Sequence, residues 1–294
     1  MTSGILLIDK STGISSGKCV YQARKKLGIK KIGHAGTLDP LATGLLPLLI
    51  NKATRVSDFL MDEVKIYETL AFFGQKTDSQ DITGEVLEKS SNTFEKKDLE
   101  RAIKENFTGE ILQTPPMYSA LKHKGRKLYE LAREGKTVER KQRKIKIYDF
   151  EILDFDFPYA RLKITCSKGT YIRSIVNDLG EILQIFATVK ELRRIKVGDF
   201  DVEDAIKIDD FEKMEAEEII NHLIPIDKAL GQYEKIILDE SYYKQATNGM
   251  TMKVDFDKNV EGYLRVYVKD LFIGLGEYKN ENKTLKIKKV FYER

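Results

Sequence analysis

A short glycine-rich segment carries the residues best suited to chemistry. Residues 33–44 read Gly-His-Ala-Gly-Thr-Leu-Asp-Pro-Leu-Ala-Thr-Gly, so one carboxylate, Asp39, stands near a histidine and two threonines. Pro40 pushes the aspartate before it out of the helical region, so the carboxylate is expected on extended or turned backbone. The glycines allow conformations closed to other residues and let a ligand approach the main chain. Asp-Pro and glycine clusters also mark ordinary surface turns, and the segment alone favours that interpretation.

Several other kinds of site are not expected. The glycine-rich segment lacks the Gly-Lys-Ser/Thr of a nucleotide-binding P-loop. The chain has three histidines, and its two cysteines, Cys19 and Cys166, form no Cys-x-x-Cys motif, so we expect no metal site. Both cysteines are expected to be reduced, buried thiols of a cytoplasmic protein. No apolar run is long enough to cross a membrane, and the N-terminus lacks a signal-peptide pattern.

Positive charge is concentrated in two segments, although the net charge of the 294 residues is only +4. Residues 10–31 contain seven Lys or Arg and no acidic residue, and residues 119–146 contain eleven against three Glu. Residues 201–220 reverse the balance, with nine acidic residues against two lysines. One basic run alone would fit an ordinary solvated helix face. Two such runs on either side of a glycine-rich carboxylate loop favour a polyphosphate partner, namely a nucleic acid.

Periodicity predicts the elements that position the glycine loop. A buried strand is expected over residues 5–8, followed by a helix over 18–27 that Ser16 would cap. Residues 65–73 have β-propensity and place Tyr67 within an apolar strand, where a core tyrosine is the commoner case. Further elements are a helix over 94–107, a strand over 161–165 and a helix that starts after residues 167–170.

Arg173 stands at the start of that last helix, where a cation opposes the helix dipole. Its position therefore indicates a carboxylate partner nearby. The acidic segment Asp201–Glu218 is expected to be helical. From about Tyr233 the pattern changes to short strands, with Gly274 and Gly276 flanking a turn, so residues 233–294 are expected to form a separate β-rich module.

Taken in order along the chain, these segments resemble the TruB-type tRNA pseudouridine synthases. Residues 33–44 resemble the family signature, and the other matching segments follow in the expected order: 7–16, 65–78, 115–129, 167–173 and 192–194. The tail is similar to a PUA RNA-binding domain. The chain departs from the family pattern at Ser11, where proline is usual, and at residues 184–189, which lack the usual glycine and histidine.

The resemblance implies an α+β fold, with a mixed, mainly antiparallel sheet flanked by helices. It implies a catalytic domain over residues 1–232, an inserted RNA-binding thumb over 119–146, and a PUA-like domain over 233–294. The implied reaction is isomerisation of uridine 55 in the T loop of tRNA to pseudouridine, after the uridine has been flipped out of its stack. The partner would be the T-stem-loop of tRNA. We expect the chain to act as a monomer, with no cofactor, protein partner or membrane.

The resemblance also implies roles for individual residues. Asp39 would be the catalytic carboxylate and Arg173 its partner, and both attack on the base and attack on the sugar fit these residues. Tyr67 would stack on the target base and serve in proton transfer. The remaining implied site residues are His34 where the base leaves its stack, Tyr171 and Leu192 in the pocket wall, and Lys10, Lys122, Lys124 and Arg126 on RNA phosphates.

Two other functions stay open at this point. The chain could be a non-catalytic RNA-binding or RNA-folding protein on the same scaffold, although the presence of Asp39, Tyr67 and Arg173 argues against it. It could also be a guide-dependent relative that works within a ribonucleoprotein. Such relatives typically carry extra charged termini and lack the thumb, so the basic segment at 119–146 argues for the tRNA enzyme.

Overall fold

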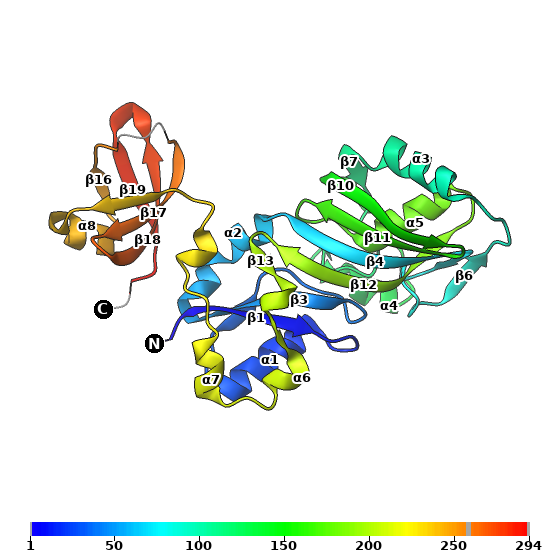
Figure 1. Cartoon of the computed structure of the whole chain (residues 1–294), viewed down its shortest axis with the longest axis horizontal. Coiled ribbons are helices and arrows are strands. Elements are labelled where there is room, and N and C mark those ends of the chain that lie inside the picture. Colours follow the sequence, from blue (N-terminus) through cyan, green and yellow to red (C-terminus); the bar gives the residue numbers. More distant parts are fainter. Residues whose placement is uncertain (1, 257–259, 293–294) are drawn as a thin grey trace.

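The computed structural model describes residues 2–256 and 260–292. These residues form a large sheet with helices and, towards the C-terminus, a smaller sheet set apart from it (Figure 1). The ten-stranded large sheet has the path β14 (Ile206–Lys207), β1 (Gly4–Lys10), β3 (Thr43–Ile50), β12 (Ala187–Val197), β4 (Lys65–Phe73), β11 (Tyr159–Cys166), β10 (Arg143–Asp156) and β7 (Gly109–Gln113), with β2 (Ile32–His34) on β3 and β13 (Phe200–Asp201) on β12.

Most neighbours in this sheet are antiparallel, and only the β1–β14 and β3–β12 pairs are parallel among the described strands. The predicted α+β class with a mainly antiparallel sheet is therefore confirmed. The strand predicted over 65–73 has those same bounds, and the strand predicted over 5–8 extends to both sides.

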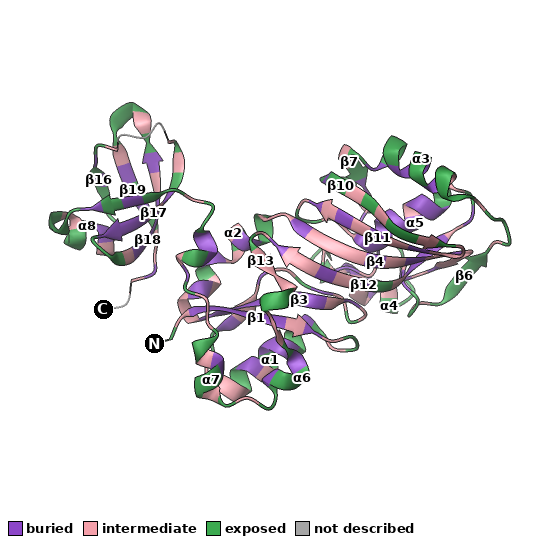
Figure 2. Ribbon diagram, viewed as in Figure 1, coloured by how far each residue is buried: buried purple, intermediate pink, exposed green. Residues whose placement is uncertain are grey.

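Helices cover one face of the large sheet. The apolar stripes of α1 (Ser16–Leu27), α3 (Lys96–Asn106) and α5 (Ile172–Ile182) pack there against β1, β3, β4 and β11. The opposite face of β1 and β3 is covered by η1 (Asn51–Val56), α2 (Ser57–Asp62) and η3 (Lys228–Leu230). Figure 2 shows the result, with buried residues along the strands and exposed residues on the outer side of α3. Strand β1 is accordingly apolar on both faces.

The helix predicted over 18–27 is present, but Ser15 caps it, because its hydroxyl accepts a hydrogen bond from the Lys18 amide. Ser16 is the first helical residue, and its hydroxyl is bound to the backbone of Leu38 instead. A hairpin of β5 (Gln75–Thr77) and β6 (Val86–Lys89) precedes α3 in the chain. A second hairpin, β8 (Lys122–His123) with β9 (Arg126–Lys127), and the short helix α4 (Leu128–Arg133) lie between α3 and α5.

The prediction of a helix over Asp201–Glu218 is wrong. The segment forms the end of β13, η2 (Val202–Asp204), β14 and α6 (Ile208–Phe211), and it then enters α7 (Ala216–Asn221). Pairing of Ile206 and Lys207 with β1 interrupts any continuous helix. The nine acidic residues of this segment thus lie on a series of short elements at the edge of the sheet beside β1.

The C-terminal residues form the expected β-rich module. Its five-stranded sheet has the order β15 (Lys235–Leu238), β17 (Gly262–Val268), β18 (Leu271–Lys279), β19 (Thr284–Val290) and β16 (Thr251–Lys253), with η4 (Glu240–Tyr242), α8 (Tyr243–Thr247) and η5 (Asn280–Asn282) at its edges. Gly274 and Gly276 do not flank a turn, because both lie inside β18. A Cβ on Gly274 would lie 2.0 Å from the Lys289 carbonyl oxygen, so the glycine allows β19 to approach closely.

The small sheet is docked against η1 and α2. The Arg55 guanidinium donates to the Val290 carbonyl (2.9 Å), and Phe59 makes edge-on ring contacts with Tyr233 and Tyr263. Leu275 and Phe291 complete this contact and share one apolar cluster with β1 and β3.

Candidate active site

Asp39 and Arg173 form the central ion pair of the candidate site. Asp39 lies in the loop between β2 and β3, and Arg173 lies in the first turn of α5. The Arg173 Nε and Nη2 atoms lie 2.9 and 2.8 Å from Asp39 Oδ2. The arginine side chain is 3% exposed, whereas the aspartate side chain is 36% exposed. The carboxylate partner expected for Arg173 is therefore present, and that carboxylate keeps one side open to solvent.

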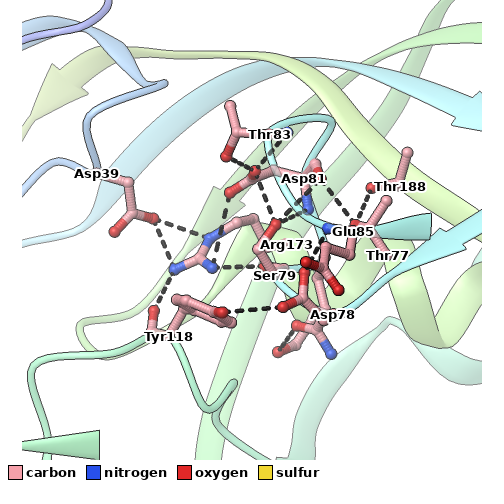
Figure 3. A network of polar contacts seen from close by, with 12 residues as sticks. Asp39, Thr77, Asp78, Ser79, Asp81, Thr83, Glu85, Tyr118, Arg173 and Thr188 are labelled. Carbon is pink, nitrogen blue, oxygen red and sulfur yellow. Dashed lines mark hydrogen bonds and ion pairs between the residues drawn. The ribbon is translucent and has the colours of Figure 1, made fainter. Parts of the chain in front are cut away.

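Arg173 also holds two other segments of the chain. Its Nη1 donates to the Ser79 carbonyl and its Nη2 to the Tyr118 carbonyl, both at 2.7 Å (Figure 3). A second carboxylate oxygen, Asp81 Oδ2, lies 3.8 Å from Nη1. The planar guanidinium has five N–H donors in a fixed fork, which suits several acceptors at once. One buried side chain thus fixes the Asp39 loop, the turn after β5 and the segment before the thumb.

The segment before the thumb has a further anchor in the same network. The Tyr118 hydroxyl donates to Asp78 Oδ2 (2.9 Å), and Asp78 Oδ1 accepts from the Glu85 amide (2.8 Å) (Figure 3). Donation to this carboxylate raises the pKa of Tyr118, because the hydrogen bond is broken when the phenol ionises. Neither Asp78 nor Tyr118 was a candidate from the sequence.

The backbone of the Asp39 loop is fixed by Arg194 on β12. This side chain is 1% exposed, and it donates from Nε to the Leu45 carbonyl (2.8 Å) and from Nη2 to the Gly36 carbonyl (3.1 Å). Gly44 has φ +98° and packs on the Arg194 backbone so closely that a Cβ would lie 2.3 Å from its carbonyl oxygen. The loop that carries Asp39 is therefore clamped to the centre of the sheet.

Tyr67 lies on β4 directly opposite Arg194 on β12. Burial raises the pKa of Tyr67, and the nearby Arg194 guanidinium opposes that effect. Asp39 is close enough to raise the pKa of this phenol further. Tyr67 is consequently a neutral phenol at neutral pH, with a buried cation beside it that would stabilise its ionised form.

Tyr171 also lies close to Asp39. Its backbone is clamped by the side chain of Gln113, which accepts from the Tyr171 amide (2.9 Å) and donates to the Tyr171 carbonyl (3.0 Å). Burial raises the pKa of the Tyr171 phenol, and the Asp39 charge adds to that shift. The structure thus brings Tyr67, Tyr171 and Arg173 together around Asp39.

His34 lies on β2, opposite Leu48 of β3, and Leu192 lies on β12. The pKa of His34 is lowered by burial and by the Arg194 charge, so the ring is neutral at neutral pH. Its Nδ1 is buried without a hydrogen-bond partner among the described residues. Leu192 is buried, and its carbonyl accepts from the Thr43 hydroxyl (3.4 Å). Within the described chain no hydrogen bond or ion pair joins either residue to Asp39, so their expected roles stay predictions.

The position of Lys10 does not fit the predicted phosphate contact. Its side chain is fully buried, and Nζ donates to the carbonyls of Ser11, Ile14 and Pro40 at 2.9, 2.9 and 3.4 Å. Burial lowers its pKa to about 8. Lys10 therefore stabilises the loop just after Asp39, through its hydrogen bond to the Pro40 carbonyl. The sequence could not distinguish this role, because a lysine at the end of a strand is usually solvated.

The three thumb residues expected to contact RNA phosphates have exposed side chains, and the phosphate contacts themselves stay predictions. Lys122, Lys124 and Arg126 are exposed on or beside the β8–β9 hairpin, with Lys124 at its tip. Arg126 forms an ion pair with Glu134, whereas Lys122 and Lys124 form no ion pair with any described residue. Residues 143–146 of the predicted basic insertion begin β10 and pair with β7.

Sequence reasoning missed Gln113 and the distinct role of Arg194. Alternation along β12 offered a signal for Arg194, because it stands two residues after the buried Leu192 and so points to the same face. Gln113 gave no such signal. Across residues 2–256 and 260–292, no group of three or more His, Cys, Asp or Glu side chains could hold a metal ion. In that same part of the chain, no helix is long and apolar enough to span a membrane.

Comparison with known proteins matches these features to one family. Residues 24–172 match the model of the TruB family pseudouridylate synthase N-terminal domain. Residues 173–231 match the model of the tRNA pseudouridylate synthase B C-terminal domain. The two matches meet between Ile172 and Arg173, inside the candidate site.

Similar proteins cover nearly the whole chain. The proteins named tRNA pseudouridine synthase B from Clostridium kluyveri and Clostridium novyi are each 42% identical, over 94% and 98% of this chain and 96% and 99% of their own. A chain in a crystal structure of a Cbf5-Nop10-Gar1 complex has the same fold, with a TM-score of 0.78 and 25% identity over 100% of this chain and 86% of that one. The chain therefore belongs to the TruB family of pseudouridylate synthases.

Proposed function

We propose that the protein isomerises uridine 55 in the T loop of tRNA to pseudouridine. The observation that carries this proposal is the half-exposed Asp39 carboxylate held by two N–H groups of the buried Arg173. The reaction breaks the N1–C1′ bond, turns the base and forms a C5–C1′ bond, with no net oxidation or reduction. A fixed carboxylate suits this chemistry, because it can add to the base or to the sugar and then leave again.

The residues around Asp39 supply the other requirements of this reaction. Tyr67 and Tyr171 offer two aromatic rings that would enclose a flipped base. After the base has rejoined through C5, the proton on C5 must move to N1 or to solvent. We propose that Tyr67 relays this proton, because Arg194 lies opposite it and would stabilise the phenolate that forms in transit. The neutral His34 would occupy the space that the uridine leaves in its stack.

Flipping the uridine costs a few kcal/mol, and contacts with phosphates would offset that cost. We propose residues 1–232 as the catalytic domain, residues 119–146 as the thumb and residues 233–294 as a PUA-like RNA-binding domain. We propose Lys122 and Lys124 as phosphate ligands of the thumb, since both are exposed and form no ion pair with a described carboxylate. We also propose that the protein works in the cytoplasm as a monomer, with bare tRNA as its partner.

The direct test measures tritium release from T-arm RNA labelled at C5 of the uridine. Asp39→Asn keeps the size of the side chain and removes its charge, so we expect RNA binding without tritium release. Asp58→Asn on the exposed start of α2 is the matched control and should behave as the wild type. Tritium release by Asp39→Asn at the wild-type rate would overturn the assignment of Asp39.

The substrate is tested separately with purified protein and an unmodified T-arm transcript. Activity without any guide RNA is expected, whereas activity only with a guide RNA would favour the ribonucleoprotein alternative. Replacing Lys122 and Lys124 by alanine should make the negative slope of log affinity against log salt less steep, by about 0.7–0.9 for each phosphate that is no longer bound. An unchanged slope would contradict the proposed role of the thumb.

A further inference from the structure

One exposed face of α1 has a composition that the Asp39 site does not use. Lys18, Tyr21 and Lys25 follow each other at helical spacing and are all exposed, whereas Cys19, Val20 and Ala23 on the opposite face are buried. Tyr21 is 65% exposed, more than any other large hydrophobic side chain in the described part of the chain. A single exposed aromatic ring is ordinary on a protein surface, so the significance of Tyr21 depends on the lysines on either side of it.

The start of α1 is attached directly to the loop that carries Asp39. The Ser16 hydroxyl accepts from the Leu38 amide (2.9 Å) and donates to the Leu38 carbonyl (3.1 Å). The Gly13 amide donates to the Pro40 carbonyl (2.8 Å), and the Thr12 hydroxyl donates to the Leu41 carbonyl (3.0 Å). RNA bound with its uridine at Asp39 therefore passes close to the first turn of α1.

The charges around α1 leave one side of the helix open to an anion. On one flank Glu212 binds Gln22 through its carboxylate, and its carbonyl accepts from the Lys26 ammonium (3.1 Å). The acidic residues of α6 continue this flank. Neither Lys18 nor Lys25 forms an ion pair with any residue of the described chain. A polyanion would be repelled from the flank of Glu212 and attracted to the stripe of Lys18, Tyr21 and Lys25.

We propose that this stripe binds the single-stranded RNA next to the flipped uridine, with two phosphates on the lysines and one nucleobase stacked on Tyr21. Lys18 and Lys25 are seven residues apart, which is about 10 Å along a helix, so the two ammonium groups would reach two different phosphates of one strand. Aromatic rings between basic residues are the usual means of holding unpaired bases. The inference rests on the proposed function, and it moves the RNA contact of the first basic segment from the buried Lys10 to the outer face of α1.

The experiment measures binding of a fluorescein-labelled T-arm stem-loop RNA by anisotropy at several salt concentrations, together with kcat and KM. The double variant Lys18→Ala/Lys25→Ala should make the negative slope of log affinity against log salt less steep by about 1.4–1.8, which is 0.7–0.9 for each of two phosphates. Its kcat at saturating RNA should equal that of the wild type. Lys97→Ala/Lys104→Ala removes the same charge from the exposed face of α3 and is the matched control.

Tyr21 is tested by a second pair of variants. Tyr21→Ala should raise Kd about 5- to 150-fold, which corresponds to the removal of one stacked base. Tyr21→Phe keeps the ring and should bind as the wild type. Equal Kd values for Tyr21→Ala and the wild type, or a salt slope of the α1 lysine variant equal to that of the α3 control, would overturn the inference. The two proposals can fail separately. If the wild-type protein released no tritium but these variants still bound RNA more weakly, the α1 contact would be supported and the proposed catalytic function would fail.

Discussion

Replacement of Arg173 by lysine tests whether the ion pair with Asp39 depends on the shape of the guanidinium or only on its charge. The guanidinium reaches Asp39, Ser79 and Tyr118 at the same time, at distances of 2.7–2.9 Å. An ammonium group is compact and cannot reach acceptors that far apart. Lysine would therefore keep the positive charge but could satisfy only about half of these acceptors.

The expected decrease in stability follows from the hydrogen bonds that lysine cannot make. Removing a hydrogen bond costs about 0.5–1.5 kcal/mol, and a buried carbonyl left without a donor costs about 1–3 kcal/mol. We therefore expect Arg173→Lys to lower the free energy of unfolding by about 2–4 kcal/mol. At roughly 2–3 °C per kcal/mol for a chain of this size, Tm should fall by about 4–12 °C. Displacement of Asp39 by about 1 Å should in addition lower kcat on the order of 100-fold.

The assays are thermal unfolding followed by circular dichroism, and tritium release measured well below the lower Tm. Arg161→Lys is the matched control, because Arg161 is 43% exposed and its contact with Glu191 is long, at 3.5 Å. That substitution should change stability by less than about 0.5 kcal/mol. If Arg173→Lys melts and reacts as the control does, the guanidinium does not organise the site, and its proposed role is refuted.

Three further outcomes are expected. Gly44→Ala should lower the free energy of unfolding, measured by chemical denaturation, by about 3 kcal/mol or more, because its Cβ would collide with the Arg194 carbonyl. Gly13→Ala is the control: no atom lies within 4 Å of its Cβ, so it should lower the free energy of unfolding by only about 1–2 kcal/mol. Lys10→Met should leave the salt slope of RNA binding unchanged. Because burial lowers the pKa of Lys10 to about 8 in the folded state from 10.5, the folded protein binds fewer protons than the unfolded chain between these values, so wild-type stability should rise relative to Lys10→Met from pH 8 to 10.5. Burial raises the pKa of Cys19 and brings that of Cys166 to about 12, so a chromogenic disulfide reagent at pH 8 should label both thiols only after unfolding; fast labelling of the native protein would contradict their burial.

The strands and helices that carry the site could be predicted because their patterns are local. β-Propensity identified β4 with its true bounds, and the apolar stripe of α5 placed Arg173 at a helix start, where its need for a carboxylate was already visible. The resemblance of residues 33–44 to a family signature then identified Asp39. These signals need no knowledge of what lies next to each element in space.

The errors concern features that depend on distant contacts. Ser15 and Ser16 are equally good caps by type, and only the bond of Ser16 to Leu38 decides between them. The acidic segment cannot form one continuous helix, because Ile206 and Lys207 pair with β1, and that contact is not visible in the sequence. Gly274 is of a residue type common in turns, but here it lies in β18 and lets the backbone of β19 come close to it. Lys10 could not be recognised as buried, because the sequence does not show that the loops with its three carbonyl partners fold around its side chain.

The position of Arg173 also has a consequence for the folding of the chain. Its partners Asp39, Ser79 and Tyr118 are 134, 94 and 55 residues away along the chain, so the three loops must all be closed before the guanidinium is satisfied. Closing such loops costs conformational entropy, and only the contacts of the completed sheet offset that cost. Contacts between residues this far apart in the sequence therefore form late in folding. A nascent chain that ends before α5 cannot hold Asp39 in place. Recovered catalytic activity during refolding should therefore follow the slowest phase, after most of the secondary structure has returned.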